Sequence, residues 1–272
     1  MALADAYDGR AASWDREVCL VYRPLAVALV RSSPVPLAGG TVLDVGSGTG
    51  AVAEAAEAAG ASVVAVDRSL DMLAFATSRR PLAGADVAAL PFRDEAFDAA
   101  LAGFVLNHLP PLTALREMAR VVRPGGVVVA STWAGGGRDP VKAAIDDVLH
   151  RWGWRSPDWY RRMMADVLPV SGDLTRLSSA ARAAGLVDVA AAVRREDVGV
   201  RHASTAVAYR LATPQIAPWL ARLDSPTKAQ LIQQACNAVS PIIEQWRPAV
   251  VLLAARVDRQ TNRRACRSNA AA

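Results

Sequence analysis

The feature that most constrains the fold is a short apolar run that leads directly into a cluster of glycines. Residues 41–45 read Thr-Val-Leu-Asp-Val, and Gly46, Gly48 and Gly50 follow at alternate positions. An alanine-rich, helix-forming segment then occupies residues 51–59. A strand that passes through glycines into a helix brings backbone N–H groups to the carboxyl edge of a sheet, where ligands bind in open α/β folds. We therefore predict an α/β fold with a ligand site at this turn.

The first half of the chain alternates between strand and helix patterns, which is typical of a parallel sheet with helices on both faces. The Arg123-Pro124-Gly125-Gly126 segment is expected to end a helix in a tight turn. Further strands are predicted over residues 62–66, 97–106 and 127–132, and helices over residues 70–78 and 112–122.

The alternation breaks after residue 132. Two long segments, 141–166 and 204–246, have helical patterns, and we expect them to meet over one edge of the sheet as a cap. Between and after them we predict a helix over 174–184 and strands over 187–200 and 249–257, which would complete a seven-stranded sheet. The cap segments carry the aromatic residues Trp152, Trp154, Trp159, Tyr160, Tyr209 and Trp219, which are suited either to an apolar substrate pocket or to packing of the cap on the sheet.

Composition excludes several classes of protein. The chain has 272 residues, 52% of them hydrophobic, which is enough for a substantial core. We find no apolar run long enough to span a bilayer and no signal-peptide pattern, so a cytoplasmic location without membrane contact is expected. The three cysteines (Cys19, Cys236 and Cys266) are odd in number and far apart, so neither a disulfide framework nor a metal site is expected.

The net charge of +5 does not by itself indicate an anionic partner. Much of the surplus lies in residues 256–267, near the end of the chain, and a charged terminal segment of this kind is usually solvated. Nearly all of the basic residues are arginines, because Lys142 and Lys228 are the only lysines.

Three acidic residues follow predicted strands and suggest what the site binds. Asp44 lies two residues before Gly46, where a carboxylate would repel a pyrophosphate but attract an ammonium group. Asp67 is placed to accept hydrogen bonds from a ribose diol, or else to cap the next helix in competition with Ser69. Asp86 can accept from an adenine amino group, or else be a surface turn residue, and the Val87 N–H would then donate to the ring.

Taken in order, these motifs resemble those of the class I S-adenosylmethionine (SAM)-dependent methyltransferases. They are Asp44-x-Gly46-x-Gly48-x-Gly50, then Asp67, then Asp86 before Leu90-Pro91-Phe92 and Phe97-Asp98, and last the Pro124-Gly125-Gly126 turn. The likeness is to the small-molecule branch, which includes ubiquinone and menaquinone biosynthesis enzymes and natural-product methyltransferases. It covers residues 5–135. The resemblance implies a Rossmann-like, doubly wound sheet of seven strands.

The resemblance also implies which residues hold SAM. Asp44, Gly46 and Gly48 would border the methionine moiety, Asp67 would bind the ribose, and Asp86 with Val87 would bind the adenine. Met72 is expected either on the adenine face or in the core. Tyr7 and Trp14 belong to a Tyr-Asp segment similar to the family's N-terminal lid, although Trp14 stands where tyrosine is usual and core packing would explain it equally well. Further cofactor contacts are expected from Ser47, Arg23 (to the methionine carboxylate), Arg68 and Phe104.

Methyl transfer is an in-line displacement, and alignment of the reactants alone supplies roughly 7–11 kcal/mol of the barrier. A general base is required only when the acceptor must lose a proton. His108, in the loop after the strand predicted over residues 97–106, is the first candidate, although a structural histidine would look the same. His202 and Tyr22 are weaker catalytic candidates.

We therefore predict one methyltransferase domain over residues 1–258, with a lid (1–36), a SAM-binding core (41–133) and cap insertions with the remaining sheet (134–248), followed by a basic tail (259–272). The expected partner is a small hydrophobic or aromatic acceptor of secondary metabolism, in a monomer or homodimer.

Three other functions are considered. The chain lacks the Pro-Cys nucleophile and the Asp/Asn-Pro-Pro-aromatic spacing of DNA methyltransferases, so no nucleic acid is expected. A SAM-binding protein that does not methylate, such as a regulator or a repurposed cyclase, stays open. A nicotinamide oxidoreductase is disfavoured by Asp44.

Overall fold

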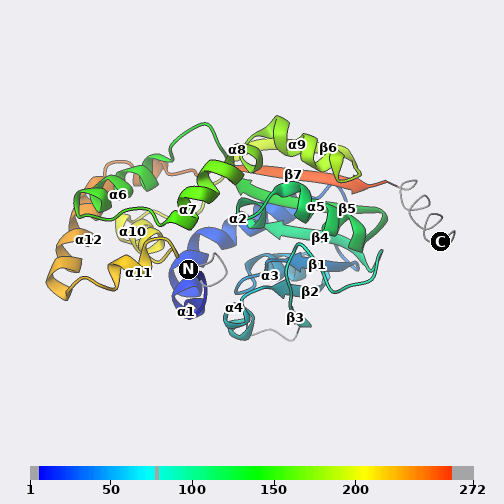
Figure 1. Cartoon of the computed structure of the whole chain (residues 1–272), viewed down its shortest axis with the longest axis horizontal. Coiled ribbons are helices and arrows are strands. Elements are labelled where there is room, and N and C mark those ends of the chain that lie inside the picture. The colour runs from blue at the N-terminus through cyan, green and yellow to red at the C-terminus, as the bar shows by residue number, and fades with distance from the viewer. Residues whose placement is uncertain (1–5, 77–79, 259–272) are drawn as a thin grey trace.

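The computed structural model describes residues 6–76 and 80–258, and the statements below concern that part of the chain. Its centre is a seven-stranded sheet in the order β3-β2-β1-β4-β5-β7-β6 (Figure 1). The predicted Rossmann-like α/β fold is therefore confirmed. The predicted tail, 259–272, and the end of the helix predicted over 70–78 lie outside the described residues. The strands are β1 (Thr41–Val45), β2 (Ser62–Asp67), β3 (Leu82–Gly84), β4 (Phe97–Gly103), β5 (Val122–Trp133), β6 (Leu186–Arg195) and β7 (Ala249–Val257).

The direction of the strands fixes where the ligand crevice lies. β1 pairs in parallel with β2 on one side and with β4 on the other, and β4 pairs in parallel with β5. β7 is antiparallel to both β5 and β6. The order of the strands reverses at β1, so the chain leaves the carboxyl ends of β1 and β4 in opposite directions. Open α/β sheets bind ligands at this switch point.

Both faces of the sheet are covered by helices. The side chains of β4 show this, because they pack alternately into one core and the other. In β4, Ala99 and Leu101 pack into the core on one face, whereas Ala100 and Ala102 pack into the core on the other. Side chains of a strand alternate between faces, so a strand buried on both sides has no polar face and reads as a continuous apolar run. The covering helices are α2 (Cys19–Arg31) and α3 (Ala51–Ala58) on the first face, and α5 (Pro111–Val121) and α9 (Leu174–Ala183) on the second.

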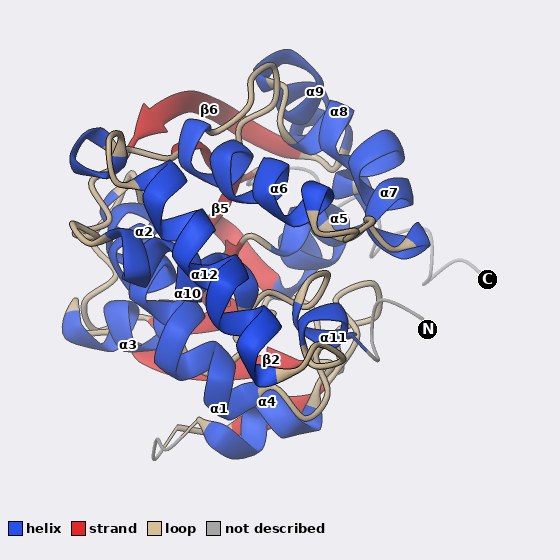
Figure 2. Cartoon of the chain, turned by 90° about the vertical axis from the view of Figure 1, so that its left-hand side faces the viewer, coloured by secondary structure: helices blue, strands red, loops and turns tan. Residues whose placement is uncertain are grey.

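The remaining large helices form a helical cap at one end of the molecule (Figures 1 and 2). We use this name for α6 (Pro140–Arg151), α10 (Ala203–Leu211), α11 (Ala217–Leu220) and α12 (Ser225–Val239). α12 packs against both α6 and α10, so the two long segments predicted to meet as a cap do lie together. A third core lies between them, and Trp154 and Trp246 are among its fully buried side chains.

The N-terminal segment runs between this cap and the sheet (Figure 1). It consists of α1 (Ala11–Ser13), a π-helical turn over Trp14–Val18 and then α2. Val18, Val21 and Leu25 bury their side chains in the core of the cap, and Ala26 and Leu29 bury theirs against the sheet. This segment therefore packs against both halves of the molecule.

Several element boundaries differ from the predicted ones. A short strand ahead of Asp86 was expected, but the bounds of β3 were not, because its three residues are mostly exposed and carry no strand pattern. β5 begins at Val122 and includes the Pro-Gly-Gly segment that we expected to be a turn. A Cβ on Gly126 would lie 2.5 Å from the Asp98 carbonyl oxygen, so glycine lets the strand pass close to β4. β6 ends at Arg195, five residues before the predicted end.

The segment predicted as helical over 141–166 divides into three elements, and α8 follows it. α6 ends at Arg151, and Gly153, two residues later, has a φ of +89°. It is followed by α7 (Asp158–Arg162), a π-helical turn (Met163–Val167) and α8 (Leu168–Ser171). The segment 204–246 likewise divides into α10, α11, α12 and a short 3-10 helix (Ile243–Gln245). Among the described residues, no helix has the length and apolar character needed to cross a bilayer. The remaining elements are α4 (Leu70–Phe75) and a 3-10 turn at Val105–Asn107.

Candidate active site

A cavity of about 250 Å³ lies at the carboxyl ends of β1, β2 and β4, where the strand order reverses. We call it the glycine-loop cavity. Its lining brings together most of the residues that the sequence assigned to the cofactor. They are Tyr7, Trp14, Gly46, Ser47, Gly48, Asp67, Arg68, Met72, Asp86, Val87 and Phe104.

At Gly46, the glycine loop has neither the space nor the backbone conformation for a larger side chain. Gly46 has a φ of +66°, and a Cβ there would lie 2.3 Å from a methyl carbon of Val105. The loop is also tied to the end of β2, because the Ser47 N–H donates to the Val66 carbonyl (2.9 Å) and the Gly48 N–H donates to Asp67 Oδ2 (2.8 Å). A backbone with φ near +60° suits glycine and strains other residues. The glycines thus let the backbone itself form the wall of the cavity.

Asp67 is held at the end of β2 with both carboxylate oxygens engaged. Oδ2 accepts from Gly48, and Oδ1 accepts from the Ser69 N–H (2.8 Å). Each oxygen keeps accepting capacity, because a carboxylate has about four lone-pair sites. Desolvation raises the pKa of this carboxyl above its usual value. Ser69 provides the N-cap of α4, accepting from the Met72 N–H, so Asp67 remains available to a ligand.

The expected adenine end of the cavity is more open. Asp86 is exposed, and its Oδ1 accepts from the Ala88 N–H (2.9 Å). The Arg68 guanidinium lies 3.6 Å from Asp86 Oδ2. Met72 is 2% exposed and lines the cavity, so it belongs to the core and to the site at once.

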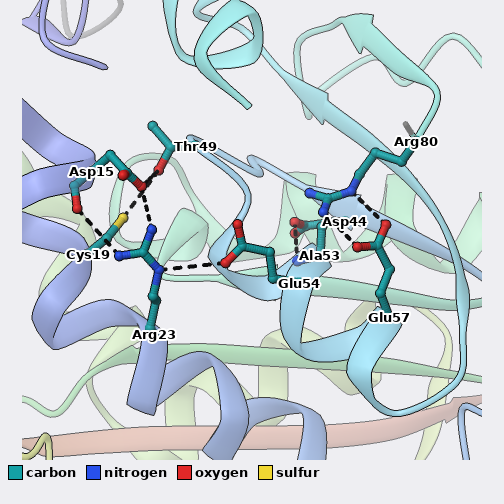
Figure 3. A network of polar contacts seen from close by, with 9 residues as sticks. All are labelled: Asp15, Cys19, Arg23, Asp44, Thr49, Ala53, Glu54, Glu57 and Arg80. Carbon is teal, nitrogen blue, oxygen red and sulfur yellow. Dashed lines mark hydrogen bonds and ion pairs between the residues drawn. The ribbon is translucent and has the colours of Figure 1, made fainter. Parts of the chain in front are cut away.

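Two expected cofactor contacts, Asp44 and Arg23, do not line the cavity. Figure 3 shows the polar contacts that they make instead. Asp44 is fully buried behind the loop, where Oδ2 accepts from the Ala53 N–H near the start of α3 (2.9 Å). Burial raises the pKa of the Asp44 carboxyl to about 7. Arg23 pairs with Asp15 (2.6 Å) and lies 3.6 Å from Glu54. Asp15 also accepts from the Thr49 hydroxyl at 3.3 Å, and Cys19 contacts that hydroxyl at 3.2 Å. The structure therefore assigns Asp44 and Arg23 to holding the loop and the N-terminal segment in place.

A second cavity, of about 460 Å³, lies between the sheet edge and the helical cap. We call it the aromatic cavity. Trp133, Trp159, Tyr160 and Tyr209 line it, whereas Trp152, Trp154 and Trp219 of the cap do not. The sequence had grouped these aromatic residues together without separating the two roles.

The two cavities share one wall, formed by Tyr7, Trp14, Tyr22, Phe104 and His108. The ring centroids of Tyr22 and Phe104 are 4.9 Å apart, and Trp133 continues the cluster at 4.5 Å from Phe104. Phe104 has a φ of +62°, which turns the chain sharply after β4. Aromatic rings at these separations pack favourably. The wall thus combines the N-terminal segment with the loop after β4.

His108 lies in this wall and contacts the lid segment. The Tyr7 hydroxyl is 3.1 Å from His108 Nε2, and the buried Nδ1 has no partner among the described residues. Desolvation lowers the pKa of His108 to about 4, so the ring is neutral at pH 7. It also raises the pKa of Tyr22 well above its usual value, so that hydroxyl stays protonated. His202 is exposed at the start of α10 and lines neither cavity, so the structure does not bring it to the site.

Sequence reasoning missed the polar residues of the aromatic cavity. Lys142, at the start of α6, and Arg210, on α10, both line it. The sequence offered one sign that could have drawn attention to Lys142, namely that it is one of only two lysines in the chain.

The fold and the position of the glycine-loop cavity are those of a Rossmann-like α/β domain with its ligand crevice at the switch point of the sheet. Residues 43–130 match the family model described as "Methyltransferase domain". The resemblance to class I SAM-dependent methyltransferases is therefore confirmed for this part of the chain, which includes the glycine loop and β4.

Curated relatives that match part of the chain carry methyltransferase names, and a solved structure shares the fold. The chain is 40% identical over 135 residues to a demethylmenaquinone methyltransferase of Renibacterium salmoninarum, covering 48% of this chain and 55% of that protein. It is 35% identical over 156 residues to a malonyl-[acyl-carrier protein] O-methyltransferase of Pseudescherichia vulneris, covering 55% of this chain and 61% of that protein. The chain thus spans about half the length of the curated relatives it matches. A phosphoethanolamine N-methyltransferase 2 of Haemonchus contortus shares the fold, with a TM-score of 0.59, 16% identity, and coverage of 95% of this chain and 61% of that chain.

Proposed function

We propose that this protein is an enzyme that transfers a methyl group from SAM to an oxygen, nitrogen or carbon atom of a small hydrophobic or aromatic metabolite. The observation that carries the proposal is the wall shared by the two cavities. It places a site with cofactor-type residues directly beside an aromatic cavity. A methyl donor on one side and an acceptor on the other would meet at Tyr22, Phe104 and His108.

The residues of the glycine-loop cavity fit SAM chemically. The cavity mixes apolar side chains with polar groups, and two of the latter, the buried hydroxyls of Ser47 and Ser131, have no hydrogen-bond partner among the described residues. Buried hydroxyls are normally paired, so these are available to a polar ligand. Asp67 would hold the ribose hydroxyls, and Asp86 with Val87 would hold the adenine. When bound, SAM supplies an electrophilic methyl group on a sulfonium.

This chain's own contribution is alignment and exclusion of water at the shared wall. The rings of Tyr22, Phe104 and Trp133 surround the meeting point with apolar surface. Preorganised alignment of two reactants is worth several kcal/mol of the barrier. The names of the relatives include a quinone-type methyltransferase, which is consistent with an aromatic acceptor.

The test is isothermal titration with SAM and, separately, with NADH, followed by assay of S-adenosylhomocysteine formation with aromatic acceptors. We expect micromolar SAM binding, no NADH binding and turnover with at least one acceptor. SAM binding without any turnover would support the alternative, a SAM-binding regulator or cyclase. Binding of NADH alone would contradict the proposal.

His108 is proposed as the group that accepts the acceptor's proton, with Tyr7 holding the ring. His108→Ala should lower turnover while leaving the affinity for SAM nearly unchanged. A base must be deprotonated to act, so with a pKa of about 4 the wild-type rate should be flat from pH 6 to 8 with respect to this group. The measurement is the rate as a function of pH for both proteins. A His108→Ala rate equal to that of the wild type would remove the base role.

A further inference from the structure

Two cations that line the aromatic cavity have no ion pair among the described residues, namely Lys142 and the exposed Arg195, and Lys142 is the one that lies over aromatic rings. Lys142 projects from the first turn of α6, and its Nζ lies 3.2 Å from the centroid of the Trp133 ring and 6.0 Å from that of Tyr209. Among the described residues we find no hydrogen bond or ion pair of this ammonium group. A cation over an aromatic face is attracted to the ring, but the contact supplies no negative charge.

The two acids that line the cavity are already engaged. Asp139 accepts from the Lys142 backbone N–H (2.9 Å) and from Trp246 Nε1 (2.9 Å). Asp146 accepts both hydrogen bonds of the Arg210 fork, at 2.8 and 2.7 Å. Bidentate pairs of this kind are strong and geometrically fixed. Neither carboxylate is therefore arranged to neutralise Lys142.

The charges around the cavity have a positive excess. Its lining contains the cations Arg138, Lys142, Arg195 and Arg210 and the acids Asp139 and Asp146. Tyr209 is buried, and desolvation raises its pKa well above the usual value, so that hydroxyl stays neutral. A ligand that brings a negative charge would be favoured in such a cavity.

Building on the proposed function, we infer that the acceptor is an aromatic acid, whose anionic oxygen binds the Lys142 ammonium while its ring packs among Trp133, Tyr160 and Tyr209. The negative oxygen is a carboxylate or an ionised acidic hydroxyl, and in both cases it supplies the counter-charge that Asp139 and Asp146 do not. Lys142 is thus a specificity-determining residue. It recognises the acceptor at a point connected to the shared wall through the Trp133–Phe104 contact.

A lysine also suits this role better than an arginine. Removal of the group from water lowers the pKa of Lys142 to about 7, with Arg210 lowering it further and Asp139 and Asp146 raising it. The ammonium is therefore at the edge of ionisation in the free protein, and an anionic ligand stabilises the charged form. An arginine would remain charged throughout.

The test uses three bicyclic probes of similar shape: 2-naphthoate, 4-hydroxycoumarin, whose acidic hydroxyl is ionised at neutral pH, and the neutral 2-naphthamide. Each is titrated into the wild type, Lys142→Met and Lys228→Met, with and without S-adenosylhomocysteine. Lys228, on α12, lines neither cavity and is the matched control. We expect 2-naphthoate or 4-hydroxycoumarin to bind the wild type at least tenfold more tightly than 2-naphthamide. That advantage should be lost in Lys142→Met and kept in Lys228→Met.

Which probe gains the advantage identifies the source of the negative oxygen. Equal affinities of all three probes for the wild type, no binding of any of them, or an unchanged advantage in Lys142→Met would overturn the inference. The titration with S-adenosylhomocysteine alone reports on the proposed function independently. If S-adenosylhomocysteine does not bind while the anionic probes still bind more tightly in a way that depends on Lys142, the cofactor assignment is wrong and the acid site stands.

A second measurement does not depend on a substitution in the aromatic cavity. With two lysines, protein labelled with [13Cε]lysine gives two lysine signals, which Lys228→Met assigns. Addition of 2-naphthoate should move the titration midpoint of the Lys142 signal to higher pH and leave that of Lys228 unchanged. An unmoved Lys142 midpoint would contradict the ion pair.

Discussion

The two cavities of this protein are built in different ways. The glycine-loop cavity is formed by loops at the ends of adjacent parallel strands, and its polar groups come largely from one compact stretch of sequence, between Gly46 and Val87. The aromatic cavity draws its lining from the N-terminal segment, the end of β5, α6, the π-helical turn after α7, and α10. The first depends on backbone conformation and the second on side chains that meet only after folding. Substitutions should therefore act differently in the two places.

The largest expected effect is on the stability of the cap. Arg210 is 5% exposed and pairs bidentately with Asp146. Removal of one partner leaves a buried charge without compensation, so Arg210→Met should lower the free energy of unfolding by about 3–5 kcal/mol. Urea unfolding measures it.

The Asp146→Leu/Arg210→Met double variant should recover most of that loss, since it removes both charges. Arg138→Met, which breaks an exposed ion pair with Asp147 of α6, should change stability very little. A double variant as unstable as the single one would show that packing, rather than the ion pair, holds α10 to α6.

The next effect is confined to the glycine loop. Gly46→Ala adds a Cβ that would overlap Val105 in a backbone conformation unfavourable to alanine. Overpacking and strain of this kind cost about 2–4 kcal/mol together, and we expect at least a hundredfold loss of S-adenosylhomocysteine affinity by titration.

Gly39→Ala separates the two causes. Gly39 has a similar φ of +74° but no atom within 4 Å of an added Cβ. It should therefore lose some stability and keep its affinity for the ligand. If Gly46→Ala bound as well as Gly39→Ala, close approach of the backbone would not be the basis of the cavity.

A smaller effect is expected at the ribose position. Asp67→Ala should weaken SAM binding by about 1–3 kcal/mol, because the ribose hydroxyls would lose their acceptor. Asp173→Ala, which removes the N-cap of α9 away from both cavities, is the control and should leave the affinity unchanged. Unchanged affinity in Asp67→Ala would contradict the ribose assignment.

A separate effect, seen only as a change of stability with pH, belongs to Lys142 in the absence of ligand. Its pKa falls from 10.5 to about 7 on folding, so between those values the unfolded chain binds more protons than the folded one. Stability contributed by this group therefore rises as pH increases from 7 to 10, by at most about 1.4 kcal/mol per pH unit. Lys142→Met should lack this rise. The measurement is thermal unfolding across that pH range, with Lys228→Met retaining the wild-type slope.

The glycine-loop cavity was predictable from the sequence to a large extent. Gly46, Asp67 and Asp86 follow apolar runs directly, and the carboxyl ends of parallel strands share one edge. Asp44 shows the limit of this reasoning. It has the expected position in the chain, but its side chain points into the start of α3 rather than into the cavity.

The aromatic cavity was not predictable in the same way. Trp154 and Trp159 look equivalent in the sequence, yet the first is packed inside the cap and the second lines the cavity. Helical periodicity places a residue on a face, but which neighbour meets that face depends on how α6, α10 and α12 pack.

By itself, the sequence determined the α/β class, the succession of strands and helices along the first half of the chain, and the ligand edge. Those follow from local patterns and from glycines that few other residues could replace. Only the tertiary structure decided that Lys142 lies over Trp133 without an ion pair, and that Tyr7 meets His108 across a separation of 101 residues. Contacts of that kind depend on the relative placement of distant elements, which no local pattern encodes.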